Sequence, residues 1–511
     1  MTRTALLLAA ALALLCGAPR AQDDAAAPAG PPPIVVKIYH TNDIHGWIMP
    51  RPDRLQSDRP LGGAAALKSL LNRDANPKLV LDAGDWWQGT PEGSSDHGQT
   101  VAEVFNAVGY DAAELGNHEF DAGQDALKAL IANFKMPVLA ANVYGPDGKH
   151  VPWAKQRIIK DVAGVKFGIF GLITSHMDKL ETPARLAGLT FRREADEARD
   201  QVAALKKEGA DVIIALTHVG YEAPDRPPFE GDQTLAREVE GIDLIVGGHT
   251  HTPLYHAWRD PAHGTLVVQA GSFLAKVGRT TLKIDPASHR VIASSDELLE
   301  LWPDRVGEDA GVKAVVARRE AEVGEAFALV VATATSDLSR GFDGRESGLG
   351  SWAADCLRAS AGTEAFILNG RALRADIPAG PVTARRLFEA LPYEDQIVRL
   401  EMTGAQLRAA LDRVVGATQI AQVSGMTAEF SKNKPPHERL GAVTVAGAPV
   451  DDAKSYSVAT VEFVAGSYEE FSLAGPARET GTRARDALRA CAENQKTIAP
   501  PPAGRLKDLG E

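Results

Sequence analysis

Short apolar runs recur along the first part of the chain, and helix-like stretches lie between several of them. The runs occupy residues 34–39, 79–81, 138–143, 167–173, 212–216, 244–246 and 266–269. Residues 64–71 place their leucines on one side of a helix, and residues 195–207 repeat Ala and Leu at helical spacing. Strands that alternate with helices indicate an α/β domain.

The pattern breaks at Trp302-Pro303-Asp304, and a second region follows. Residues 308–327 contain no Pro and are rich in Ala, Val, Glu and Arg, which predicts a helix that links two domains. Beyond it, helical patterns at 349–358 and 405–415 mix with strand patterns at 365–368, 397–402 and 456–463. A chain of 511 residues is too long for one core and suits two domains.

Residues 1–21 have the features of an export signal. Arg3 supplies the positive start, residues 5–15 are apolar, and Ala21 offers a small residue before a cut. The apolar run is too short to span a bilayer, and no later stretch suits a membrane helix. A lipid anchor at Cys16 stays an alternative, although Leu15 is bulky where that signal prefers a small residue. We therefore expect an exported protein, either periplasmic or secreted.

These boundaries divide the chain into six segments. They are the signal (1–21), an Ala- and Pro-rich leader (22–33), a first domain (34–305), the linking helix (306–329), a second domain (330–499) and a tail (500–511). The tail is rich in Pro and charge, and we expect it to be loose.

The composition is that of a globular protein, with 44% hydrophobic and 24% charged residues. The net charge is −12, and removal of residues 1–21, which carry two arginines and no acid, leaves −14. So acidic a chain has no overall attraction for nucleic acid or anionic membranes. An anionic substrate must be attracted locally, by metals and a few arginines.

Cys356 and Cys491 are the two cysteines that remain beyond the signal. They could form a disulfide in an exported chain, but the sequence leaves their pairing open. There is no cysteine cluster of the zinc-binding type, so metal binding falls to His, Asp and Asn.

Five short stretches place metal-binding side chains just after predicted strands. They are Asp43-Ile44-His45, Gly84-Asp85, Gly116-Asn117-His118-Glu119-Phe120-Asp121, Thr217-His218 and Gly248-His249-Thr250-His251. Taken singly, each stretch could have a purely structural role, such as forming a turn or capping a helix. Five of the 13 histidines fall in these stretches, and side chains two apart on extended backbone point the same way. Together they predict two adjacent divalent metals, a device for attacking phosphorus with water.

This set resembles the calcineurin-like metallophosphoesterases. The surrounding Thr41-Asn42-Asp43-Ile44-His45-Gly46 and the second domain narrow the resemblance to the secreted 5′-nucleotidase family, which includes UDP-sugar hydrolases and 2′,3′-cyclic nucleotide phosphodiesterases. The resemblance implies an α/β protein, a four-layer αββα sandwich followed by a smaller mixed α/β substrate-binding domain. The active site would lie in the cleft between them.

The same resemblance implies a role for each metal-site residue. Asp43, His45 and His251 would hold one ion, Asn117, His218 and His249 a second, and Asp85 both. His118 would stand near the scissile phosphate, oriented by Asp121. Nitrogen and oxygen ligands suit zinc, manganese, iron or cobalt, and the sequence does not choose among them.

The second domain carries a candidate substrate site. Asn369-Gly370-Arg371-Ala372-Leu373-Arg374 is similar to the family's Asn-Gly-Gly-Gly-Ile-Arg turn, which implies phosphate binding by Arg374 and, from a second motif, Arg345. Tyr393 and Phe463 would stack on the nucleobase, and Glu469 would replace a ribose-binding Asp. The alternatives are solvated arginines and, for Phe463, core packing at the end of a strand.

The predicted function is an exported phosphoester hydrolase that releases phosphate from nucleoside monophosphates by attack of a metal-bound hydroxide. Arg371 and Ala372 replace two family glycines, and Tyr468 and Glu470 replace two more around Glu469. These departures keep a UDP-sugar diphosphatase or a 2′,3′-cyclic nucleotide phosphodiesterase as alternatives. A non-catalytic nucleotide-binding protein would be expected to have lost a ligand or His118, and none is missing. The oligomeric state stays open.

Overall fold

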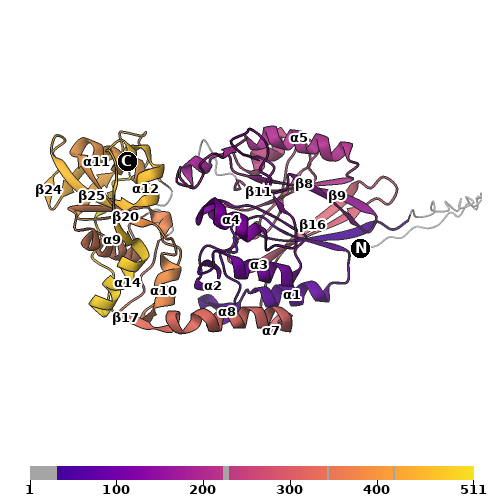
Figure 1. The fold of residues 1–511 in the computed structure, drawn as a ribbon, viewed down its shortest axis with the longest axis horizontal. Coiled ribbons are helices and arrows are strands. Elements are labelled where there is room, and N and C mark those ends of the chain that lie inside the picture. Colours follow the sequence, from indigo (N-terminus) through magenta and orange to yellow (C-terminus); the bar gives the residue numbers. More distant parts are fainter. Residues whose placement is uncertain (1–30, 222–229, 342–344, 418–419, 511) are drawn as a thin grey trace, which may run out of the picture.

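The computed structural model describes residues 31–221, 230–341, 345–417 and 420–510. The predicted export signal at 1–21, the alternative anchor at Cys16 and most of the leader lie outside the described residues. The described chain forms two bodies side by side, a larger one from the first half and a smaller one from the last third (Figure 1). Among the described helices, none has the length and apolar character needed to cross a membrane.

The larger body contains two six-stranded sheets. The first, in spatial order, is β16 (Val291–Glu300), β15 (Lys276–Ile284), β1 (Ile34–Thr41), β4 (Lys78–Asp82), β5 (Ala112–Glu114) and β6 (Val138–Leu139). The second is β13 (Trp258–Arg259), β14 (Leu266–Val268), β12 (Leu244–Gly247), β11 (Val212–His218), β9 (Val165–Ile173) and β8 (Arg157–Val162). Strands β1, β4, β5 and β6 run parallel, as do β9, β11, β12 and β14.

Alternate residues of the central strands enter different cores, because successive side chains of a strand point to opposite faces. Ile38 of β1 joins Phe167 of β9 in the layer between the sheets. Tyr39 of β1 instead packs among helices α1 (Ala64–Arg73), α3 (Gln99–Val108) and α4 (Gly123–Ile131). Phe170 of β9 packs against α5 (Glu194–Lys207) and α6 (Asp232–Glu238). The four-layer αββα sandwich that the family resemblance implied is therefore confirmed (Figure 1).

Shorter elements complete this body. They are strands β2 (Arg51–Asp53), β3 (Arg59–Leu61), β7 (Val143–Tyr144) and β10 (Thr190–Phe191), helices α2 (Pro91–Ser94) and α7 (Pro303–Val306), and 3-10 turns η1 (Arg54–Gln56), η2 (Asn117–Phe120) and η3 (Met177–Lys179). The expectation of a single strand at 138–143 is wrong. It is split into β6 and β7, which belong to different sheets. Between them the Asn142 amide donates to the carbonyls of Ile173 and Arg192, which draws the chain away from the first sheet.

Helix α8 (Ala310–Ala328) occupies the stretch for which the sequence predicted a linking helix. Asp309 caps its start by accepting hydrogen bonds from the backbone N–H groups of Gly311 and Val312, both at 3.0 Å. Val312 is buried in the core of the larger body, whereas Phe327 packs against the core of the smaller one. The helix thus belongs to both bodies and runs along one side of them (Figure 1).

The smaller body is a mixed α/β domain with three sheets. Their spatial orders are β21 (Gln422–Ser424), β18 (Ala365–Leu368), β25 (Ser455–Val461), β20 (Gln396–Thr403), β26 (Arg478–Arg483); β19 (Gly380–Thr383), β17 (Val330–Ala334), β27 (Thr497–Ile498); and β24 (Ala448–Pro449), β23 (Leu440–Val445), β22 (Met426–Phe430), β28 (Leu506–Asp508). Its helical segments are α9 (Gly348–Ala361), η4 (Gly370–Ala372), α10 (Ala384–Ala390), α11 (Gly404–Val415), α12 (Glu462–Ser467), α13 (Glu469–Ser472) and α14 (Ala484–Gln495).

Two expectations for this domain are wrong. The tail is not loose, because β28 pairs in parallel with β22 and the Arg505 guanidinium binds both carboxylate oxygens of Asp355 at 2.7 and 2.8 Å. The strand expected at 456–463 ends at Val461, and Phe463 lies in α12. Neither the pairing of the tail nor the change to helix is visible in the local pattern of apolar residues.

Cys356 of α9 and Cys491 of α14 form a disulfide across 135 residues of sequence. We expect its removal by a double Cys→Ala variant to lower the free energy of unfolding of this domain by about 2–5 kcal/mol, because the cross-link restricts the unfolded chain. Scanning calorimetry would measure the loss. Turnover below the unfolding temperature should be unaffected, since neither cysteine lies at the metal centre. An unchanged melting temperature would contradict the expectation.

Candidate metal centre and active site

The five predicted stretches lie at one edge of the sandwich, because strands β1, β4, β5, β11 and β12 all end there. One ligand atom from each of Asp43, His45, Asp85 and His251 lies within 4.8 Å of the others. The Nε2 atoms of His45 and His251 are 3.0 Å apart, and His251 Nε2 is 3.2 Å from Asp43 Oδ1. Such a group of imidazoles and carboxylates can hold a divalent cation.

A second group adjoins the first through Asp85. Asp85 Oδ2 lies 3.6 Å from His45 Nε2 and 3.2 Å from His218 Nε2, so the carboxylate faces both groups. The His218 and His249 rings are 5.2 Å apart, and His249 Nδ1 is 2.9 Å from Asn117 Oδ1. The structure thus brings together all seven residues that the sequence nominated as ligands.

The buried imidazoles are oriented as metal ligands are. Nδ1–H of His45 donates to the Gln88 carbonyl at 2.7 Å, and Nδ1–H of His218 donates to the Ala83 carbonyl at 2.6 Å. These bonds leave the Nε2 lone pairs directed at the centre. His218 Nε2 is buried and faces the Asp85 carboxylate at 3.2 Å, so a cation between the two groups could bind both. Burial also lowers the pKa of His45, His249 and His251, which favours the neutral form that binds metal.

The ligand-bearing loops are tightly turned. Asp43, His45, Asp85, His249 and His251 have φ of 50°, 51°, 60°, 76° and 56°. The expectation that the paired residues two apart lie on extended backbone is therefore wrong. Left-handed backbone is costly for residues with a side chain and concentrates at functional sites. Here the turns, and not the pleat of a strand, direct both members of each pair at the centre.

Glu119 and Asn42 organise these loops, and sequence analysis assigned neither a role. The Glu119 carboxylate accepts backbone hydrogen bonds from Gly116, Asp85 and Trp86 at 2.7, 2.9 and 2.8 Å, which ties the loop after β4 to the loop after β5. The Asn42 amide donates to Asp43 Oδ2 at 2.6 Å and to the Gly271 carbonyl. Both residues stand inside the motifs, and that position is the only signal that could have identified them.

Glycine is required where these loops meet. A Cβ added at Gly116 would lie 2.2 Å from Asp85 Oδ1, and one at Gly248 would lie 2.5 Å from the Ala83 carbonyl oxygen. Any side chain at either position would push the ligand loops apart.

His118 lies beside the ligand groups and is paired with Asp121. Its Nδ1 is 3.0 and 3.1 Å from the two carboxylate oxygens of Asp121, and its backbone N–H donates to Asp85 Oδ1 at 3.0 Å. Burial opposes a charge on His118, but the nearby carboxylates of Asp121 and Asp85 outweigh it and raise its pKa well above the ordinary value. The pair can therefore hold a proton next to the metal centre.

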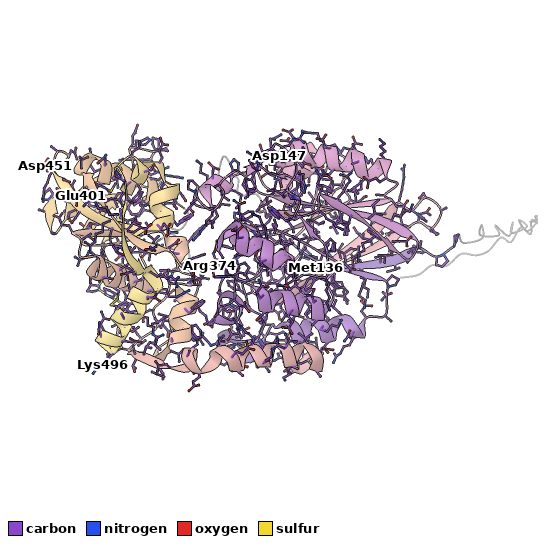
Figure 2. All side chains as sticks on the ribbon, viewed as in Figure 1. Met136, Asp147, Arg374, Glu401, Asp451 and Lys496 are labelled. Carbon is purple, nitrogen blue, oxygen red and sulfur yellow. A yellow bond between two sulfur atoms is a disulfide. The ribbon has the colours of Figure 1, made fainter. Side chains whose placement is uncertain are left out.

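Two predicted substrate residues of the second domain reach this centre. Nη2 of Arg374, which Figure 2 labels at the junction of the two bodies, lies 2.9 Å from His45 Nε2 and 3.5 Å from His251 Nε2. The Tyr393 ring is 5.6 Å from the His118 ring. The second domain thus places a cation and an aromatic ring beside the ligands of the first.

For the other predicted substrate residues, no contact with the ligand residues was found among the described residues. Arg345 and Glu469 have exposed side chains, so their roles stay predictions. Asn369 is partly buried, and its Oδ1 has no hydrogen-bond partner among the described residues. Phe463, now in a helix, lies with its ring 6.1 Å from that of Tyr468, a residue that replaces a family glycine.

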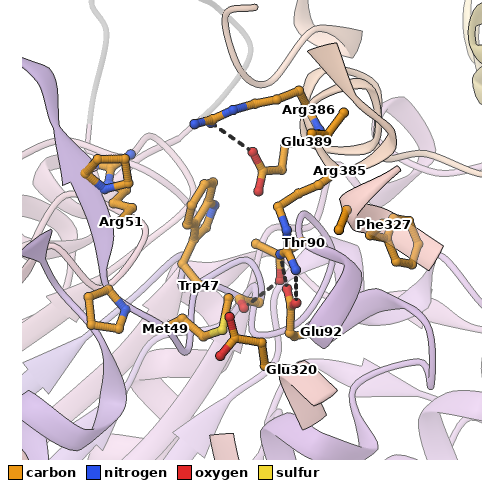
Figure 3. A pocket seen from close by; sticks show the side chains of 15 residues that line it. Trp47, Met49, Arg51, Thr90, Glu92, Glu320, Phe327, Arg385, Arg386 and Glu389 are labelled. Atoms are coloured by element: carbon orange, nitrogen blue, oxygen red, sulfur yellow. Dashed lines mark hydrogen bonds and ion pairs between the residues drawn. The ribbon is translucent and has the colours of Figure 1, made fainter. Parts of the chain in front are cut away.

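A cavity of about 370 Å³ lies between the two bodies and α8, next to the loop that follows His45 (Figure 3). Trp47, Met49 and Phe327 supply much of its apolar lining. On its wall the Arg385 guanidinium binds both oxygens of the Glu92 carboxylate, which is only 1% exposed, at 2.6 and 2.7 Å. This ion pair joins α10 of the second domain to α2 of the first.

Comparison with known proteins agrees with this architecture. Residues 36–253 match the calcineurin-like phosphoesterase family, and residues 330–475 match the C-terminal domain of 5′-nucleotidases. A 5′-nucleotidase of Diplobatis ommata is 28% identical over 541 residues, covering 93% of this chain and 90% of that protein. The UshA protein of Yersinia enterocolitica is 26% identical and covers 84% of each chain. The solved 5′-nucleotidase precursor of Thermus thermophilus superimposes with a TM-score of 0.85, at 28% identity, over 93% of this chain and 100% of its own.

The sandwich, the clustered ligands and the family matches define a metal-dependent phosphoester hydrolase. With the second domain included, the chain belongs to the 5′-nucleotidase family, as the motifs predicted.

Proposed function

We propose that the protein is an exported 5′-nucleotidase that releases phosphate from nucleoside monophosphates. The observation that carries the proposal is the approach of Arg374, from the second domain, to 2.9 Å from His45 in the metal centre, with Tyr393 beside His118. A guanidinium suits a phosphate and an aromatic ring suits a base, so the two together select a nucleotide. The relative named 5′-nucleotidase supports the same substrate class.

Two divalent ions would occupy the centre. Asp43, His45 and His251 would hold one, Asn117, His218 and His249 the other, and Asp85 both. Zinc, manganese, iron and cobalt all suit these ligands. When bound, such a pair neutralises the phosphoryl oxygens and lowers the pKa of water.

The chain's own residues would bind the substrate and move one proton. Arg374 and Arg345 would hold the phosphate, Tyr393 and Phe463 the base, and Asn369 and Glu469 the polar groups of the nucleoside. His118, held by Asp121, would give its Nε2 proton to the leaving 5′ oxygen as the bond from phosphorus to that oxygen breaks and water supplies the new one.

The test is an activity screen on purified, metal-replete protein with metal analysis of the same sample. Phosphate release from AMP with Mn²⁺ or Zn²⁺, and its loss with a chelator, is the expected result. No hydrolysis across a broad panel of phosphate esters would contradict the proposal and favour a nucleotide-binding protein without activity.

A second candidate is hydrolysis of a diphosphate, as in a UDP-sugar, or of a 2′,3′-cyclic nucleotide. Arg371 favours it, because its exposed side chain stands in η4, three residues before Arg374, and its charge acts on both His249 and Tyr468. A second phosphate could be attracted there. The values of kcat/KM for AMP, a UDP-sugar and a cyclic nucleotide would separate the candidates.

Arg374→Ala should lower kcat/KM for AMP by about 10- to 100-fold, the effect of losing a hydrogen-bonded charge on phosphate. Arg374→Lys should recover only part of the activity, because an ammonium group cannot form paired hydrogen bonds. Metal content should not change. The matched control is Arg399→Ala, which removes an exposed arginine of the same domain. Equal activity of Arg374→Ala and wild type would remove Arg374 from the substrate site.

A further inference from the structure

The cavity between the two domains has the size and composition of a small-molecule site. Its volume of about 370 Å³ falls in the range of such sites, about 300–1,000 Å³. The loop after β1, helix α8 and helix α10 of the second domain each supply part of its wall (Figure 3). Among the described residues that line it, none is a predicted metal ligand or substrate residue. The cavity is therefore separate from the nucleotide site.

Two carboxylates of the cavity wall are already paired with arginines of α10. Glu92 accepts hydrogen bonds from both terminal nitrogens of Arg385 at 2.6 and 2.7 Å, and Glu389 Oε2 accepts one from Arg386 Nη1 at 3.3 Å. Both glutamates are buried, and a buried charge is stable only when it is paired. These four side chains therefore add no net charge to the cavity.

Arg51, in strand β2, is the cation that remains. Its Cζ lies 5.5 Å from the centre of the Trp47 ring and 5.2 Å from that of the Phe273 ring. Among the residues that the structure describes, no carboxylate lies within 4.0 Å of its guanidinium nitrogens, and Asp53 and Glu389 act on its charge only from further away. An arginine held against aromatic rings keeps the N–H donors along its edge available to an anion.

We propose that this cavity binds a small planar aromatic anion, with its negative group on the Arg51 guanidinium and its ring against Trp47. Figure 3 shows Arg51 and Trp47 on one side of the cavity and Phe327 on the other, so a flat apolar ring would meet aromatic side chains on both sides. Glu320, an exposed carboxylate of α8, lies away from Arg51 and disfavours a second negative group there. The ligand class is therefore an aromatic monoanion.

The cavity adjoins the metal centre without being part of it. Phe273, which lies under Arg51, has its ring 5.7 Å from the His45 ring and 5.6 Å from the His251 ring. On the other side Phe327 packs against Phe388 of the second domain at 5.4 Å. The inference goes beyond the proposed function and does not depend on which phosphate ester is hydrolysed. Competition with nucleotide products separates the two sites.

The probe is 1-naphthoate, a two-ring aromatic carboxylate, and 1-naphthalenemethanol is its neutral counterpart. Isothermal titration calorimetry on the metal-replete protein should show one site for 1-naphthoate and at least about 10-fold weaker binding of the alcohol. Arg51→Gln should weaken binding of 1-naphthoate by about 10- to 100-fold, the effect of losing a charged hydrogen bond, and leave binding of the alcohol unchanged. The matched control is Arg237→Gln, which removes another arginine over a tryptophan ring, that of Trp258 at 5.3 Å, outside the cavity lining.

A cavity-filling variant tests the location without removing Arg51. Ala328 is the exposed last residue of α8 and lines the cavity, so Ala328→Trp should place an indole there at little cost to folding. Binding of both 1-naphthoate and the alcohol should be lost. This result decides the matter even if Arg51→Gln does not fold, and circular dichroism would confirm that the Trp variant does.

Competition completes the test, because a carboxylate can also bind metal ions. Adenosine with phosphate, the products of the proposed reaction on AMP, should not displace 1-naphthoate. Displacement by them, equal binding of acid and alcohol, unchanged binding in Arg51→Gln or in Ala328→Trp, or no binding of either ligand would overturn the proposal. Absence of AMP hydrolysis would contradict the proposed function and leave these binding results as they are, so the two failures are distinguishable.

Discussion

Asp85→Asn should reduce phosphate release from AMP by about 10³-fold or more, since even residues that only orient metal ligands contribute 10- to 100-fold. Asp85 Oδ2 lies within 3.6 Å of His45 Nε2 and within 3.2 Å of His218 Nε2, so its carboxylate serves both ligand groups. The amide of Asn keeps the shape but removes the charge and directs N–H groups at one of the ions. Elemental analysis should show that the variant binds less metal than the wild type under metal-replete conditions.

Asp232→Asn is the matched control for this variant. Asp232 is also fully buried, and burial raises its pKa to about 8, so it is mostly protonated at neutral pH. Its Oδ1 accepts a hydrogen bond from Thr217 at 2.6 Å, which an amide oxygen would accept as well. Metal content and turnover should match the wild type. Full activity and full metal content in Asp85→Asn would remove Asp85 from the centre and would contradict the metal assignment.

His118→Ala should lower kcat for AMP by about 10²- to 10⁴-fold, the range for loss of a general acid. The backbone N–H of His118, which donates to Asp85, is kept in the variant, so metal content should stay as in wild type. The effect should depend on the leaving group. It should be large for AMP, whose alkoxide must take up a proton, and small for p-nitrophenyl phosphate, whose phenolate need not.

His289→Ala is the matched control, because His289 forms a similar pair with Asp211, 3.1 Å away, in a turn between β15 and β16. Its removal should leave both substrates unaffected. An equal loss on AMP and on p-nitrophenyl phosphate in His118→Ala would show that His118 binds or orients the phosphate and is not the proton donor.

The metal-site residues were predictable because their chemistry is local. Asp43, His45, Asp85, His218 and His249 each follow an apolar run, and an apolar run in an α/β pattern predicts a strand whose end meets its neighbours. The backbone at these positions was not predictable. The turned loops with positive φ depend on contacts between loops, such as those of Glu119 with Asp85 and Trp86.

The second domain was harder to predict, because its substrate residues depend on how two cores pack. Arg374 and His45 are 329 residues apart, and only the packing of the domains around α8 brings them together. For Phe463 the local pattern was misleading. It predicted a strand that continues through Phe463, whereas the strand ends at Val461 and a helix follows.

By itself the sequence determined the residue types and their order: the alternation that indicates an α/β domain, the five stretches that carry the candidate ligands and the second domain with its arginines. Spacing and polarity encode these, because they act over a few residues. The tertiary structure alone decided the pairing of Cys356 with Cys491, the strand at the carboxyl end and the approach of Arg374 to the centre. Each of these joins segments distant along the chain, and the free energy that selects such contacts comes from packing the whole core and not from any local pattern.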